Sequence, residues 1–117
     1  MKNYSVVNVG NEARTELHDK LGLTGAEVSI NNLPAGANVP FVHYHKNNEE
    51  IYYIVSGKGY AVIDGEKVEL SSGTWVKISP EAKRQFFAAN DSAISYVCIQ
   101  VKSNSLEGYT MTDAIVD

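Results

Sequence analysis

Turn-forming residues interrupt this sequence at short intervals, and the runs between them alternate with a period of two. The turn signals lie at 31–36, 46–48, 56–59, 64–65, 71–73, 79–80 and 90–92. The runs between them are rich in Val, Ile and aromatic residues, and we expect strands at 26–31, 39–45, 50–55, 59–64, 66–70, 74–78, 84–89 and 94–101. Many short strands with almost no helix predict an all-β protein, an antiparallel sandwich or barrel.

Local signals refine this prediction at two places. Near the N-terminus, a short strand at 4–9 precedes a brief helix that Asn11 caps, whose apolar positions include Leu17 and which ends at Gly22. The strongest hairpin signal is the pair Asp64-Gly65, because it lies between two strand-like runs and both residue types tolerate positive φ.

Composition limits the possible partners. The chain has 117 residues with a net charge of −4, and its longest basic run is Lys83-Arg84, so nucleic acid is not an expected partner. No apolar run is long enough to cross a membrane, and the first residues lack the apolar core of a secretion signal, so we expect a cytoplasmic protein. The single cysteine, Cys98, lies in a strand-like run and is expected to be a buried core thiol.

Two histidines and a carboxylate form the constellation that carries chemistry. His43 and His45 are two residues apart, so on a strand both imidazoles project from one face, and a turn then brings Glu50 back beside them. Two nitrogens and one carboxylate make a facial triad that suits iron(II), manganese or a related divalent ion. Glu49 is the rival carboxylate, but Glu50 is in phase with Tyr52. The alternative is that the histidines only satisfy local hydrogen bonds.

The spacing His43-x-His45-x4-Glu50-x6-Gly57 resembles the first motif of the cupin superfamily. The resemblance implies a conical antiparallel jelly-roll barrel, a double-stranded β-helix, over about residues 26–101 of a single domain spanning 1–117, with a short N-terminal helix. It implies a divalent metal ion at the wider end of the barrel, which in this superfamily can be iron, manganese, zinc or nickel. One spacing differs slightly, because six residues separate Gly36 from the first histidine rather than five.

The second cupin motif departs from the family pattern. Counting from Gly73, Arg84 falls where the family has its fourth ligand, a histidine, and a guanidinium cannot bind a cation. Two interpretations remain open: Arg84 pairs with Glu50 and replaces the metal, or it clamps a carboxylate or phosphate ligand beside a three-ligand ion. Tyr52 and Tyr60 are further candidates for contacts with a ligand in the barrel pocket.

These residues support more than one function. One is a metal-dependent enzyme, of dioxygenase or isomerase type, that acts on a small anionic metabolite held by Arg84. The second is a small-molecule binding or sensing module without chemistry, and the third is a metal-free barrel. The run 51–55 is apolar on both alternating faces, so one face needs cover outside the barrel, and this predicts a homodimer.

Overall fold

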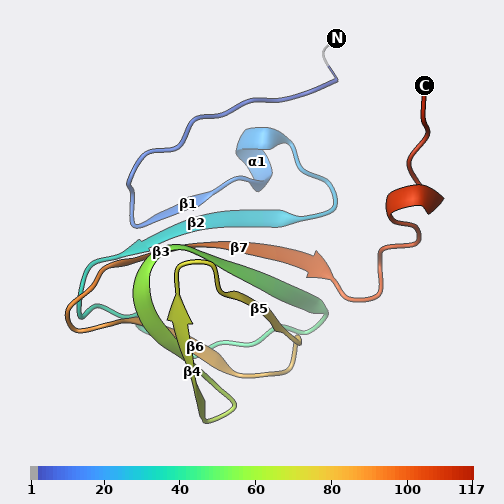
Figure 1. Ribbon diagram of the computed structural model, residues 1–117. Coiled ribbons are helices and arrows are strands. Elements are labelled where there is room, and N and C mark those ends of the chain that lie inside the picture. Colours follow the sequence, from blue (N-terminus) through green and yellow to red (C-terminus); the bar gives the residue numbers. More distant parts are fainter. Residues whose placement is uncertain (1–2) are drawn as a thin grey trace.

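The computed structural model describes residues 3–117, which form two antiparallel sheets that share one long strand (Figure 1). The elements are β1 (Arg14–Glu16), α1 (His18–Leu21), β2 (Glu27–Leu33), β3 (Asn48–Ile63), β4 (Glu66–Ser71), β5 (Trp75–Ile78), β6 (Arg84–Ala88), β7 (Ile94–Lys102) and the 3₁₀ turn η1 (Thr110–Thr112). The main strand order is β1-β2-β7-β3-β4, with β5 and β6 also paired to β3. The predicted all-β antiparallel jelly roll is confirmed.

Strand β3 links the sheets because it is long and bent. Its first half pairs with β5 and β7, and its second half pairs with β4 and β6. The bend follows a register shift between Ile54 and Ser56, and Gly57 there has φ +85°. A Cβ at this glycine would lie 1.8 Å from the carbonyl oxygen of Ala93, so only glycine fits. The two strands expected at 50–55 and 59–64 are therefore one strand that turns at Gly57.

The hairpin predicted at Asp64-Gly65 is confirmed. Both residues have positive φ, 48° and 84°, and they connect β3 to β4 with Ile63 opposite Glu66. Such a two-residue turn matches the twist of the strands that it joins.

The N-terminal expectations were partly wrong. Residues 4–9 form no strand, and the helix is confined to α1, because residues 14–16 pair with β2 as β1 instead. Backbone hydrogen bonds extend this pairing at both ends, from Asn32 to Ala13 and from Leu17 to Val28. A short isolated helix is marginal in water, so pairing with a sheet edge prevails. Gly22 does end the helix, with φ 67°.

The strand expected at 39–45 is reduced to two isolated bridges. Asn38 pairs with Phe87 and His43 pairs with Arg84, without a continuous ladder between them. Pro40 interrupts the segment because it has no N–H to donate.

The barrel interior holds the core, and it also holds charge. Alternate residues of β3 point inward, so Glu50, Tyr52 and Ile54 are 4%, 3% and 0% exposed. Cys98 is buried in the same core, as predicted. The terminal segments are not part of this core. Both extend away from the sheets in Figure 1, and apolar residues in them, such as Ile115, are exposed. No helix in residues 3–117 is long and apolar enough to span a membrane.

Candidate metal centre

Three predicted ligands converge at one end of the barrel interior. His43 and His45 come from the segment that precedes β3, and Glu50 comes from β3 itself. One nitrogen from each histidine and one oxygen of Glu50 all lie within 4.8 Å of one another. The Nε2 atom of His45 is 3.2 Å from Oε2 of Glu50, and that of His43 is 3.7 Å from Oε1. The two imidazoles meet edge to face.

Backbone hydrogen bonds hold the histidine segment in place without a regular strand. The N–H of His43 donates to the carbonyl of Arg84 at 3.1 Å, and the N–H of Arg84 donates back at 3.0 Å. The N–H of His45 donates to the carbonyl of Pro80 at 2.7 Å. Glu50 lies between Ile78 of β5 and Gln100 of β7 in the sheet, so the carboxylate is fixed by a strand paired on both sides.

The carboxylate of Glu50 is surrounded by donors. The hydroxyl of Tyr52 donates to Oε1, and the thiol of Cys98 donates to Oε2 at 3.4 Å. Burial alone would raise the pKa of Glu50, but hydrogen bonds from His43 and Tyr52 and the charge of His45 oppose this and lower the pKa to about 2. The group is therefore an anion at neutral pH, as a metal ligand must be.

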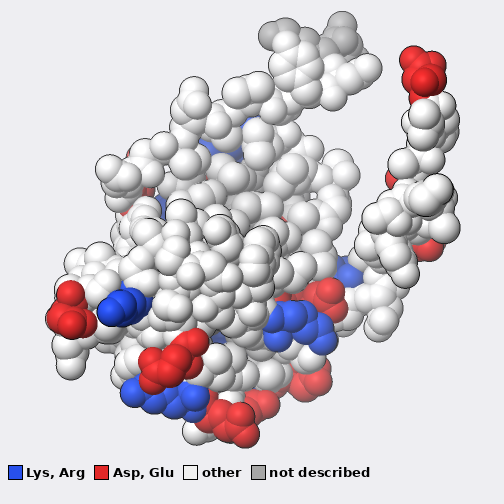
Figure 2. Space-filling view, viewed as in Figure 1, with Lys and Arg blue, Asp and Glu red and all other residues white. Residues whose placement is uncertain are grey.

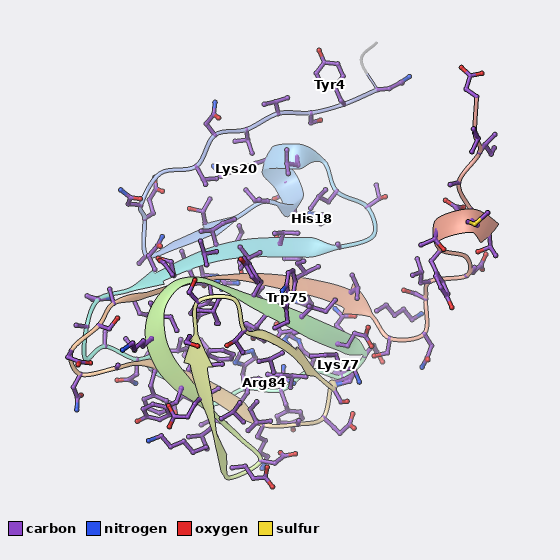
Figure 3. All side chains as sticks on the ribbon, in the orientation of Figure 1. Tyr4, His18, Lys20, Trp75, Lys77 and Arg84 are labelled. Carbon is purple, nitrogen blue, oxygen red and sulfur yellow. The ribbon has the colours of Figure 1, made fainter. Side chains whose placement is uncertain are left out.

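Arg84 is the fourth member of the cluster, and its position distinguishes the two interpretations of it. Its side chain is 0% exposed and lies between the two sheets (Figure 3). One guanidinium nitrogen donates to Oε1 of Glu50 at 2.9 Å and another donates to the carbonyl of Ser79 at 2.7 Å. The expected ion pair with Glu50 is present. The alternative of a ligand clamp is disfavoured, because the side chain is fully buried and Arg84 is not among the residues that line the cavity described below.

The donor set fits a divalent ion. Imidazole nitrogens and a carboxylate suit iron, manganese, zinc and nickel alike, and bonds of about 2.0–2.6 Å can bridge donors that are this close together. Nδ1 of His43 is buried with no hydrogen-bond partner among residues 3–117, so no such bond fixes this ring in a purely structural role. The paired Arg84 leaves at most three protein ligands.

A cavity of about 440 Å³ opens onto this cluster. Its wall is mainly apolar, with Leu33, Val39, Phe41 and Phe86 among the lining residues, and Tyr52 lines it as expected. Tyr60 does not, because it stacks on Phe87 at 4.7 Å with the ammonium of Lys67 over its ring. The alternation of the strand places Tyr60 on a different face from Ala61, which is fully buried.

Sequence reasoning missed several lining residues. Tyr96, Cys98 and Gln100 alternate along β7 and all face the cavity, a pattern that the predicted strand at 94–101 already contained. Arg14 also lines the cavity, from β1. No signal in the sequence indicated Arg14, because that segment was expected to be helical.

Comparisons with known proteins agree with this geometry. Residues 30–100 match the family described as cupin domain. A cupin protein from Bacteroides fragilis is 66% identical in its crystal structure, with a TM-score of 0.97 over 100% of this chain and 99% of that one. A predicted oxalate decarboxylase from Thermotoga maritima is 21% identical, with a TM-score of 0.58 over 66% of this chain and 64% of that one.

A further relative matches only in part. An uncharacterized protein of Methanocaldococcus jannaschii is 30% identical over 66 residues, which are 56% of this chain and 52% of the relative, so the match spans about half of that protein. The family match covers most of the present chain and includes β3 with its metal-ligand candidates. The chain belongs to the cupin family.

Proposed function

We propose that this cupin binds one divalent metal ion through His43, His45 and Glu50 and uses it to act on a small anionic metabolite. The observation that carries the proposal is the convergence of these three side chains at a cavity of about 440 Å³. A bound ion would supply Lewis acidity or, if it is iron, a site for dioxygen chemistry, in keeping with an isomerase or a dioxygenase.

The residues around the cluster have separate tasks in this proposal. Glu50 provides the anionic ligand, while Tyr52 and Arg84 fix its orientation through hydrogen bonds to Oε1. The imidazoles of His43 and His45 are partly exposed, 33% and 24%, so a small molecule in the cavity can reach them. The apolar wall excludes water from the bound ligand.

A second candidate function is binding or sensing without chemistry, and one observation favours it. Outside the ligand cluster, the ionisable groups that line the cavity within residues 3–117 are Arg14, Tyr52, Tyr96 and Cys98. Burial raises the pKa of Cys98 to about 12 and raises the pKa values of both tyrosines above their ordinary value. These groups stay protonated at neutral pH, so they can donate hydrogen bonds but cannot act as general bases.

Metal analysis of protein purified without a histidine tag or chelator tests the proposal. We expect about one divalent ion per chain, measured by inductively coupled plasma mass spectrometry, and a sharp loss of occupancy in His43→Ala, His45→Ala and Glu50→Gln. Glu49→Gln is the control, because Glu49 lies on the opposite face of β3 from Glu50. Full occupancy in His45→Ala would exclude this site.

The metal-free alternative predicts a different result. If Arg84 replaces the ion altogether, the wild type takes up no divalent metal even when it is dialysed against iron(II), manganese, zinc or nickel. That result would refute the proposed metal function.

A further inference from the structure

We propose that Arg14 binds the anionic group of the ligand at the mouth of the cavity, with the hydroxyl of Tyr96 as a second donor. This inference deepens the proposed function, since it rests on a small anionic ligand in the same cavity. It assigns the role that sequence reasoning gave to Arg84 to a different arginine. The ligand class is a monocarboxylate with an apolar body.

Strand register places the two donors on one face. Arg14 of β1 lies opposite Asn31 of β2, and Asn31 lies opposite Tyr96 of β7. All three residues line the cavity. Strands β2 and β7 separate β1 from β3, which carries Glu50, so Arg14 and the metal-binding cluster lie on different strands of the cavity wall.

Arg14 is held in position by a chain of hydrogen bonds. One guanidinium nitrogen donates to Oδ1 of Asn31 at 2.9 Å, and the amide of Asn31 donates to the hydroxyl of Ser29 at 3.0 Å. Asn31 is 6% exposed and Ser29 is 2% exposed, so this support is buried while the arginine itself reaches solvent. A guanidinium has five N–H donors, and these contacts leave several of them free for an anion.

The ion pair that Arg14 forms on the surface is weak. Its other terminal nitrogen lies 3.1 Å from a carboxylate oxygen of Glu16, and the two side chains are 54% and 61% exposed. Exposed ion pairs of this kind contribute little, about 0–1 kcal/mol, so a ligand carboxylate can compete for the guanidinium. Glu16 then acts as a competitor that occupies the site when no ligand is present.

Tyr96 carries a second hydrogen-bond donor on the same sheet face as this guanidinium. The residue is only 3% exposed and lines the cavity. Burial raises the pKa of Tyr96, and the positive charge of Arg14 opposes that rise. The phenol stays protonated at neutral pH, so its hydroxyl can donate a hydrogen bond to a ligand in the cavity.

Arg14 is also the remaining arginine that can bind the anionic group of a ligand. The chain has two arginines, and Arg84 is committed to Glu50. No lysine is among the described residues that line the cavity. The cavity is also lined by Leu33, Val39 and Phe86, which favour an apolar ligand body over a sugar phosphate.

The test uses one carboxylate and its neutral counterpart. Isothermal titration of the metal-free protein with 3-phenylpropanoate and with 3-phenylpropanamide separates recognition of the charge from burial of the ring. We expect the acid to bind about tenfold tighter than the amide, because a charge-assisted pair with Arg14 is available only to the acid. Arg14→Gln should remove this preference and leave affinity for the amide unchanged.

Two further variants control for net charge. Lys20, which Figure 3 shows on α1, lines a surface groove together with Arg14 and Glu16 but does not line the cavity, so Lys20→Gln removes one positive charge and should leave the preference intact. Glu16→Gln removes the competing carboxylate and should tighten binding of the acid by about two- to threefold while leaving the amide unaffected. Tyr96→Phe should also weaken binding of the acid, but less than Arg14→Gln does.

The outcomes separate this inference from the proposed metal function. Absence of acid binding by the wild type, or equal binding by Arg14→Gln, overturns the inference, as does an equal loss in Lys20→Gln. Metal content measured on the same preparations gives the second readout. Binding of the acid that depends on Arg14, in a protein that takes up no metal, supports the inference and refutes the metal function.

Discussion

Removal of the Arg84 guanidinium should destabilise the metal-free protein strongly. The guanidinium is 0% exposed and the Glu50 carboxylate is 5% exposed, with 2.9 Å between the bonded atoms. Breaking a buried ion pair from one side costs about 3–5 kcal/mol, because the remaining charge keeps its desolvation penalty. Tyr52 and Cys98 still donate to Glu50, so we place Arg84→Met near the lower end, about 3 kcal/mol.

A double variant separates the energy of the Arg84–Glu50 ion pair from the packing energy that is lost with the arginine side chain. In Arg84→Met/Glu50→Gln neither charge remains, and glutamine still accepts the hydrogen bond from Tyr52, so about 2 kcal/mol of stability should return. Lys83→Met is the matched control on the adjacent exposed position and should change stability by less than about 0.5 kcal/mol.

Urea unfolding in the presence of a chelator measures these free energies. Adding a divalent ion should restore part of the stability of Arg84→Met, because the freed carboxylate then gains a ligand that binds the folded state only. A loss below about 1 kcal/mol in Arg84→Met, or a double variant less stable than Arg84→Met, would refute the view that this pair neutralises the site.

Three other predictions follow from the same structure. The pKa of Glu50 is lowered from 4.5 to about 2 on folding, so the carboxylate stabilises the metal-free protein fully above about pH 4.5. Roughly 3 kcal/mol of this stability is lost as the pH falls toward 2. The urea midpoint of Glu50→Gln should therefore vary less with pH over that interval than the midpoint of the wild type. Gly57→Ala should destabilise far more than Gly65→Ala in thermal unfolding, because both glycines have φ near +85° but only at Gly57 would the added methyl meet backbone. We also propose a homodimer, since Trp75 is 63% exposed and stacks on Tyr53 on the outer face of the sheet; light scattering should give twice the chain mass at micromolar concentration, and Trp75→Glu should give a monomer.

The surface gives no competing electrostatic explanation for such a dimer. Figure 2 shows acidic and basic side chains interspersed around the lower part of the molecule, and the face over the sheet between them carries few charges. Register places Ile30, Val97, Tyr53 and Trp75 in one row across β2, β7, β3 and β5. A row of this kind is typical of a face that another surface covers.

Most of the fold could be predicted because the turns and the alternation are local signals. Asp64-Gly65 needs only its own backbone to form a hairpin, and the inward phase of Glu50 and Tyr52 follows from the period of two along one strand. The errors arose where a neighbour decides the outcome. Residues 14–16 join a sheet because β2 offers them an edge, and β3 continues through Gly57 because Ala93 lies against it. Neither partner is visible from the local sequence.

The site shows the same division. The spacing of His43, His45 and Glu50 brought them to one point as expected, even though the histidines lie on isolated backbone bonds and not on a regular strand. The choice between the two interpretations of Arg84 required its burial and its partners. Arg14 was missed because its role depends on β1, an element that sequence reasoning assigned to a helix.

Charge balance connects the two arginines to the ligand. Glu50 is the carboxylate among the described residues that line the cavity, and Arg84 already cancels its charge. A divalent ion at the cluster would therefore leave about two positive charges uncompensated in a mainly apolar enclosure. Arg14 adds a further cation at the mouth, offset only by an exposed pair with Glu16. A neutral ligand leaves this excess in place, whereas a carboxylate reduces it, so the arrangement favours an anionic ligand.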